Sequence, residues 1–195
     1  MLKTKLKKKA LVLCHYDEDL TWTTNKEFLN FKIYIYDKAK RIQDFFIAKS
    51  TVTRLPDVGT NIQTYMYHIV NQYDTLDDLT FFSQGHPFDH CPCFLEMVKK
   101  QGQYIECSEP ILTCDGEGLP HHPGLKIKEL YEHLFETPFP GSIDFMASTI
   151  YGVSKEIVLR RPKELYQKAL TCLETQFLAP WEMERMLRHM WMPTN

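Results

Sequence analysis

The chain has 195 residues, of which 44% are hydrophobic and 25% are charged, and its formal net charge is −2. This composition is that of a folded globular protein and excludes a disordered or low-complexity chain. The small net charge gives no reason to expect nucleic acid as a partner. The length fits one domain with a sizeable core, so we expect residues 1–195 to form a single α/β domain.

The N-terminal stretch does not have the features of a signal peptide. Its basic segment KTKLKKK, which we interpret as a solvated tail, precedes the apolar run ALVLC, and this run is too short for a secretory hydrophobic region. No later stretch approaches the length of a transmembrane helix. Six cysteines in a chain of this length do not form a disulfide framework. We therefore expect a cytoplasmic protein.

Strands and helices alternate in the first half of the chain. Apolar and β-branched runs predict strands at 10–16, 31–37 and 78–84. Helical spacing of apolar residues predicts an amphipathic helix at 60–73, and Asp19 is a candidate N-cap for a short helix reaching about Leu29. We expect an irregular connection at 38–58, which closes with the turn sequence LPDVG.

The second half is richer in helices and loops. A helix is expected from Cys93 with Gly102 as its C′ residue, followed by irregular loops at 103–124 with room for a ribbon at QYIECS. A last strand is expected at 143–154, where Ser154 can cap a helix. Further helices are predicted at 126–135, from Pro162 through Leu173, and from Pro180, where we expect core positions for Trp181, Met183, Met186, Leu187, Met190 and Trp191.

The alternation of strands and helices predicts a mostly parallel central sheet with helices on both faces. Ligands of such sheets bind beyond the carboxyl ends of the strands. The polar stretch HYDED follows the first predicted strand, and QGHPFDH follows the third. If the two strands run parallel, both stretches come out at the same edge of the sheet, so we expect one shared site there.

Several segments of the chain are similar to those of an uncharacterised family. CHYDEDLTW, LPDVGTNIQTYMYHIVNQYDTLDDLTFFSQGHPFDH and YGVSKEIVLRRPKELYQKAL resemble the corresponding segments of domain of unknown function 3431. The resemblance spans nearly the whole chain, and QGHPFDH is its most specific part. One departure is Gly59-Thr60-Asn61, where the family usually reads Gly-Arg-Glu.

The layout of that family resembles glycosyltransferases of the A type, which implies a nucleotide-sugar donor and an acceptor that the sequence does not identify. The usual metal-binding Asp-x-Asp motif is replaced by Gln84-Gly85-His86. A divalent cation, Mn²⁺ or Mg²⁺, would then be bound by other residues, or the transfer reaction would proceed without a cation. The resemblance implies that donor-binding residues include His15, Tyr16, Glu18, Gly59, Asn61 and Gln84.

Candidate catalytic residues are His86, Asp89 and Glu184, and candidate metal ligands are His86, Asp89 and His90. Imidazoles titrate near neutral pH and carboxylates suit hard cations. Each has a structural alternative: Asp89 can cap a helix beginning near Pro92, and Glu184 can pair with the residue four positions later. Glu184 or Asp89 would deprotonate the acceptor hydroxyl.

Two other functions remain open. His86, Asp89 and His90, with His121 or His122, could hold a cation that activates water in a metal-dependent hydrolase. The chain could also be a catalytically silent binding domain on the same fold. A zinc site using Cys91 and Cys93 is disfavoured because the Cys-Pro-Cys spacing is too short. The adjacent Arg160 and Arg161 are interpreted as a solvated helix junction, with phosphate binding as the alternative.

Overall fold

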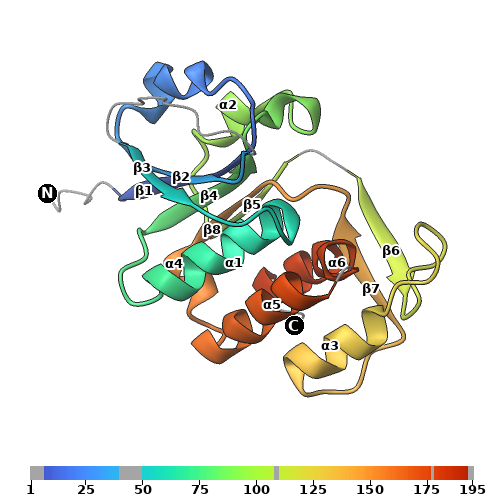
Figure 1. Ribbon diagram of the computed structural model, residues 1–195. Helices are drawn as coiled ribbons and strands as arrows, with labels where there is room; N and C mark the ends of the chain where they lie inside the picture. Colours follow the sequence, from blue (N-terminus) through green and yellow to red (C-terminus); the bar gives the residue numbers. More distant parts are fainter. Residues whose placement is uncertain (1–6, 40–49, 108–109, 177, 193–195) are drawn as a thin grey trace, which may run out of the picture.

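A six-stranded sheet of order β3-β2-β1-β4-β8-β5 lies at the centre of the computed structural model, which describes residues 7–39, 50–107, 110–176 and 178–192 (Figure 1). β3, β2, β1 and β4 run parallel, whereas β8 is antiparallel to both β4 and β5. The predicted mostly parallel sheet is therefore confirmed. The strands are β1 (Lys9–His15), β2 (Phe31–Asp37), β3 (Ser50–Arg54), β4 (Leu79–Gln84), β5 (Tyr104–Glu106) and β8 (Tyr151–Ser154).

β1 is the innermost parallel strand, and its sequence explains this position. Residues 10–14 are completely buried, as expected for a continuous apolar run covered on both faces. β1 pairs with β2 on one side and with β4 on the other, and the register places Cys14 beside Gln84. The loops that follow β1 and β4 therefore leave the sheet side by side.

Helices cover both faces of the sheet, as predicted. On one face α1 packs against β1 and β4, and α5 and α6 pack against α1 (Figure 1). The other face is covered by short elements whose aromatic rings interlock, such as Trp22 with Phe28 and Phe94. The helices are η1 (Thr21–Thr24), η2 (Lys26–Phe28), α1 (Thr60–Gln72), η3 (Pro87–Asp89), α2 (Phe94–Met97), α3 (Ile127–Phe135), α4 (Lys155–Val158), α5 (Lys163–Thr175) and α6 (Ala179–Trp191).

The segment predicted as one strand at 143–154 forms two strands in different sheets. β7 (Ser142–Met146) pairs with β6 (Ile111–Asp115) in a separate antiparallel ribbon beside α6, whereas β8 joins the central sheet (Figure 1). Between them, the Ser148 hydroxyl accepts a hydrogen bond from the Ile150 N–H at 3.2 Å. Such local side-chain bonding competes with the strand ladder, which explains the interruption.

Three other predictions were wrong in detail. The connection predicted at 38–58 contains β3, an exposed edge strand that lacks an apolar pattern, and its residues 40–49 lie outside the described part. The region 103–124 contains β6, which was not predicted, whereas β5 lies within the ribbon expected at QYIECS. Two 3₁₀ helices replace the helix expected after Asp19, whose carboxylate instead accepts hydrogen bonds from the Thr21 N–H and hydroxyl.

The helix expected from Cys93 is also shorter than predicted, because α2 ends at Met97 and Gly102 is not its C′ residue. The predictions of α1, α3, α5 and α6 are confirmed, as is the capping role of Ser154, whose hydroxyl accepts the Ile157 N–H. No helix in the described ranges has the length and apolar character that a bilayer crossing requires.

Candidate functional site

The loops after β1 and β4 meet at the carboxyl edge of the sheet. The Glu18 carboxylate accepts a hydrogen bond from the Tyr16 N–H at 2.7 Å. A Cβ atom added to Gly85 would lie 2.6 Å from the same carboxylate, so a larger residue here would displace the Glu18 side chain. The Trp22 indole N–H donates to the Gly85 carbonyl at 2.8 Å. The loops of the two predicted corners thus touch each other.

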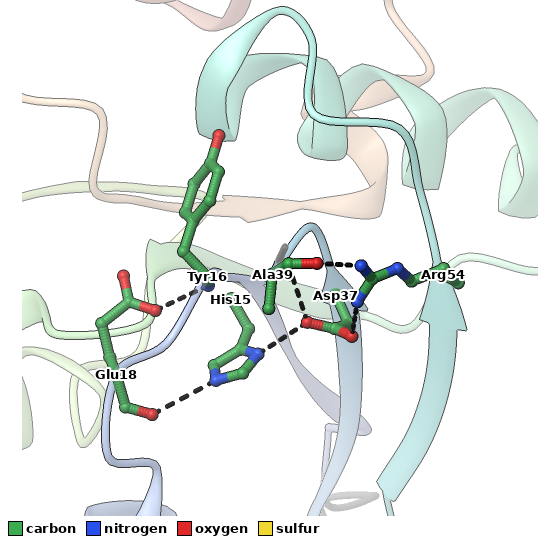
Figure 2. A network of polar contacts seen from close by, with 6 residues as sticks. All are labelled: His15, Tyr16, Glu18, Asp37, Ala39 and Arg54. Atoms are coloured by element: carbon green, nitrogen blue, oxygen red, sulfur yellow. Dashed lines mark hydrogen bonds and ion pairs between the residues drawn. The ribbon is translucent and has the colours of Figure 1, made fainter. Parts of the chain in front are cut away.

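A buried polar network, the Asp37 network, lies beside this contact at the ends of β1, β2 and β3 (Figure 2). The Asp37 carboxylate accepts the His15 Nδ1–H at 2.9 Å and the Ala39 N–H at 3.1 Å, and it forms an ion pair with Arg54. The other ring nitrogen of His15 lies 3.2 Å from the Glu18 carbonyl. His15 is only 1% exposed, so its side chain positions the loop and does not line an open site.

The electrostatics of Asp37 follow from these partners. Burial alone raises the pKa of this carboxyl group. The hydrogen bonds from His15, the Ala39 N–H and Arg54 together outweigh burial and leave the pKa of Asp37 below its ordinary value. The Asp37 network is therefore a satisfied charged cluster that fixes the ends of three strands. Tyr16 points its ring away from this network (Figure 2).

A groove runs along the same edge of the sheet and consists of two adjoining cavities of about 230 and 380 Å³. Thr60, Pro180 and Trp181 line both cavities. The smaller cavity is further lined by Asn61, Ile62, Gln84, His90, Ala147, Ser148, Thr149 and Glu184. The larger one is further lined by Tyr16, Asp57, Val58, Gly59, Leu173, Glu174, Thr175 and Gln176.

Glu184 is the acidic side chain of the smaller cavity. Burial raises its pKa above the ordinary value, and the neighbouring Arg185, His90 and His122 oppose this only in part. A carboxylate with a raised pKa in a cavity is suited to acid–base chemistry near neutral pH. The ion pair predicted between Glu184 and Arg188 is wrong: Glu184 pairs with Arg185, and Arg188 pairs with Glu106 of β5 at 3.0 Å.

Two amides from separate elements lie in the smaller cavity. The Asn61 side chain, in the first turn of α1, donates to the Thr149 hydroxyl at 2.5 Å and to the Tyr65 hydroxyl at 3.2 Å. The Gln84 side chain, at the end of β4, donates to the His86 carbonyl at 2.8 Å. Their positions are fixed by these bonds, and both side chains line the cavity.

The start of α1 has an unusual backbone that forms part of the groove. Gly59 and Thr60 both have positive φ angles, of 63° and 53°. A Cβ atom on Gly59 would lie 2.8 Å from the Leu173 carbonyl of α5. The buried Lys38 ammonium donates to the Val58 carbonyl at 2.6 Å and to the Thr60 carbonyl at 2.5 Å, and burial lowers its pKa. Gly59 is thus required by the turn and by the close approach to α5.

His86 and Asp89 lie outside the groove. Their side chains are 48% and 72% exposed, and they contact each other at 3.2 Å. His90, in contrast, lines the smaller cavity with Glu184. The structure therefore groups Tyr16, Gly59, Asn61, Gln84, His90 and Glu184 around one groove and places His86 and Asp89 on the adjacent surface.

The described residues contain no group of three His, Cys, Asp or Glu side chains placed around a common metal position. His86, Asp89 and His90 thus do not form one ligand set, and the divalent cation stays a prediction. Cys91 and Cys93 have sulfur atoms 3.9 Å apart, and burial raises the pKa of Cys91 to about 12. The predicted helix cap by Asp89 is also wrong, because α2 begins at Phe94 without a side-chain cap.

Sequence reasoning missed several residues of this site. Trp181 was expected in the core, yet it is 38% exposed and lines both cavities, because Ala179, Glu182 and Met183 form the buried side of the first turns of α6 and Trp181 does not. Asp37 and Lys38 could have been noticed, since two charged residues directly after a buried strand require partners. Thr149 gave no signal, because a lone threonine between two strands is common.

A scan against protein-family models found no match to this chain, and a search of curated proteins also found none. The resemblance to domain of unknown function 3431 and to glycosyltransferases of the A type therefore stays a prediction.

Proposed function

We propose that the protein is a glycosyltransferase that moves a sugar from a nucleotide-sugar donor, bound in the groove, to an acceptor hydroxyl. The observation that carries the proposal is the position of the groove at the carboxyl ends of β1 and β4, with Glu184 as a partly buried carboxylate in its smaller cavity. Open α/β sheets bind nucleotides at this edge. The family resemblance supports the same assignment, and fold analogy alone does not set function.

The groove offers different chemistry along its length. Tyr16 and Trp181 provide aromatic surfaces in the larger cavity for the base of the nucleotide. Asn61 and Gln84 provide amides in the smaller cavity for the hydroxyl groups of the sugar. The first turns of α1 and α6 line both cavities, and the N–H groups at the start of α1 favour the negative charge of a diphosphate.

In the proposed reaction, the Glu184 carboxylate removes the proton from the acceptor hydroxyl. The acceptor oxygen forms a bond with the anomeric carbon of the sugar, and the bond between that carbon and the diphosphate oxygen breaks. The nucleoside diphosphate leaves with the electron pair of the broken bond. Its charge is stabilised by the N-terminus of α1 and by His90. Glu184 takes this role in place of Asp89, which lies outside the groove.

The test is a thermal-shift panel of nucleotides and nucleotide sugars, each with and without Mn²⁺. A donor present at 100 times its Kd stabilises the fold by about 2.7 kcal/mol, which corresponds to a Tm rise of roughly 5–10 °C for a chain of this size. We expect this rise for a nucleoside diphosphate sugar and its loss in Gln84→Ala. Lys128→Ala, a substitution on the exposed side of α3, is the matched control and should keep it.

The panel also separates the alternatives. Stabilisation that requires Mn²⁺ would support the predicted cation, and stabilisation without it would make the cation unnecessary for donor binding. If Mn²⁺ alone stabilises the chain and His86→Ala removes the effect, the metal-dependent hydrolase gains support. If no nucleotide, nucleotide sugar or cation changes the Tm, the transferase proposal is wrong and a catalytically silent domain becomes the better account.

A further inference from the structure

A separate cavity, of about 370 Å³, lies at the opposite end of α6 from the groove. It is lined by the C-terminal half of α3, the connection between α4 and α5, and the last turn of α6, and none of its lining residues is acidic. Since α6 has 13 residues, its two ends are about 20 Å apart. We call this space the arginine cavity, because Arg160 and Arg161 line it.

The two arginines have no anionic partner in the described part of the chain. Neither the Arg160 nor the Arg161 side chain forms an ion pair or hydrogen bond with another described residue. The Arg161 guanidinium instead lies over the Phe135 ring, 5.1 Å from its centroid, and the Arg161 carbonyl accepts the Tyr73 hydroxyl at 2.5 Å. Arg161 is therefore held in place while its hydrogen-bond donors remain available.

One wall of the cavity is a packed cluster of three rings. The ring centroids of Tyr131, Phe135 and His189 lie 4.8–4.9 Å from one another. His189 Nε2 is 3.0 Å from the Tyr131 hydroxyl, and burial together with the Arg161 charge lowers the pKa of His189. Such a wall changes little on binding, so a ligand would pay only a small ordering cost.

The charges of the arginine cavity favour an anion. The C-termini of α3 and α6 reach the cavity, and each carries a partial charge of roughly −0.5. These partial charges attract cationic side chains such as those of Arg160 and Arg161. They sum to about −1, however, and two guanidinium groups carry twice that charge with the opposite sign. The cavity therefore retains a positive potential.

We propose that the arginine cavity binds a small molecule that carries a phosphate monoester, with the phosphate on Arg160 and Arg161 and the organic part against Tyr131 and Phe135. The planar donor fork of arginine matches phosphate oxygens in pairs. A volume near 370 Å³ lies at the lower end of the range for small-molecule sites. This inference does not depend on the transferase proposal, because the groove shares no lining residue with this cavity.

The test uses phenyl phosphate as the probe and isothermal titration calorimetry on the whole chain. We expect saturable binding at one site in the unchanged protein, weaker binding of inorganic phosphate and no binding of phenol. Arg160→Ala and Arg161→Met should each weaken phenyl phosphate binding at least tenfold. Methionine keeps an unbranched side chain over Phe135, so the Arg161→Met protein should remain folded, which its unfolding curve will verify.

Two control variants locate the probe. Lys128→Ala removes the same charge from α3 outside the cavity, and Gln84→Ala changes the groove, so both should bind phenyl phosphate as the unchanged protein does. The proposal is overturned if the Arg160→Ala/Arg161→Met double variant binds phenyl phosphate with unchanged affinity, or if no saturable binding occurs. If inorganic phosphate binds with the same affinity as phenyl phosphate, the placement of an organic group against Tyr131 and Phe135 is overturned.

Discussion

The carboxyl edge of the sheet contains two polar regions, which differ in whether their side chains are enclosed by protein partners or face a cavity. In the Asp37 network, each oxygen of the carboxylate meets a donor from the protein itself, and the side chains of His15 and Asp37 are almost completely buried. In the groove, Gln84, His90 and Glu184 face a cavity. Both regions follow the ends of parallel strands, so position alone does not distinguish a binding site from a structural cluster.

The comparison shows how charged residues at strand ends divide into two roles. A charged group that is satisfied by protein partners holds the loops in place, and its removal should affect stability. A polar group that faces a cavity should affect ligand binding or catalysis when it is removed, with little change in stability. His15 and Glu18, predicted to contact the nucleotide, belong to the first group by their contacts, whereas Tyr16 belongs to the second.

The largest effect is expected for Glu184→Gln. Loss of the general base should lower the rate of donor hydrolysis, measured as release of nucleoside diphosphate, by about 100-fold or more. The Kd of the donor should change little. The acid limb of the pH–rate profile should lie above the ordinary glutamate pKa of 4.5, because burial raises the pKa of Glu184, and should disappear in the variant. An unchanged rate in Glu184→Gln would remove this residue from the mechanism.

Asp37→Ala should cause the next largest effect, this time on stability. Removing one partner from a buried ion pair costs about 3–5 kcal/mol, and we expect about 3 because Arg54 is half exposed. Urea unfolding measures the loss. Asp89→Ala is the matched control and should change the free energy of unfolding by less than about 0.5 kcal/mol, since Asp89 is exposed. If Asp37→Ala and Asp89→Ala lose the same free energy of unfolding, the Asp37 network does not have the structural role described here.

The Asp37 network also predicts a pH dependence. Because the pKa of Asp37 is lower in the folded state than in the unfolded chain, its contribution to stability is present above the unfolded value, about 3.9. The contribution is lost as the pH falls through the folded pKa. Unfolding free energies measured between neutral pH and pH 3 should therefore decrease less steeply at the acid end in Asp37→Asn than in the unchanged protein.

Two glycine-to-alanine substitutions with a smaller expected effect distinguish the stability cost of backbone strain from that of close packing at the start of α1. Gly59 and Gly124 both have positive φ angles, but a Cβ atom at Gly124 would meet nothing within 4 Å, whereas at Gly59 it would approach α5. Gly124→Ala should cost about 1 kcal/mol from the backbone alone, and Gly59→Ala about 1–3 kcal/mol more from overpacking. Equal unfolding free energies for the two variants would mean that α1 and α5 can separate at no cost.

The smallest effect is expected for His86→Ala. Its side chain is half exposed and contacts Asp89 on the surface, so donor affinity should change by less than about twofold and stability by less than about 0.5 kcal/mol. Calorimetric titration with the donor measures the first quantity. A larger loss of affinity would return His86 and Asp89 to the binding site and would require the loop after β4 to move.

The sequence alone predicted those elements whose residue pattern lies within one short segment of the chain. The buried run at 10–14 predicted β1, the apolar spacing of Ile62, Tyr65, Met66 and Ile69 predicted α1, and the parallel alternation predicted that the loops after β1 and β4 meet. β3 escaped detection because an exposed edge strand such as STVTR has no apolar period. The division at 147–150 was missed because β7 and β8 are both apolar, and only tertiary pairing assigns them to different sheets.

The site could be predicted only in part, because residue type does not determine which side of a loop a side chain takes. QGHPFDH was correctly expected at the edge of the sheet, yet within it His90 lines the groove and His86 does not. Glu184 and Trp181 reach the groove through the packing of α6 against α1, which is a contact between residues far apart in the chain. No local pattern reports such a contact.

The most direct test of the central claim is a map of backbone amide chemical shifts during titration with a nucleoside diphosphate sugar. The account predicts that the perturbed amides cluster at Tyr16, Gly59–Asn61, Gln84–Gly85, 147–149 and Trp181, all of which line or border the groove. Amides around Arg160 and His189 should stay unchanged. Shifts confined to another surface, or no shifts at millimolar donor, would contradict the claim that the groove is the donor site.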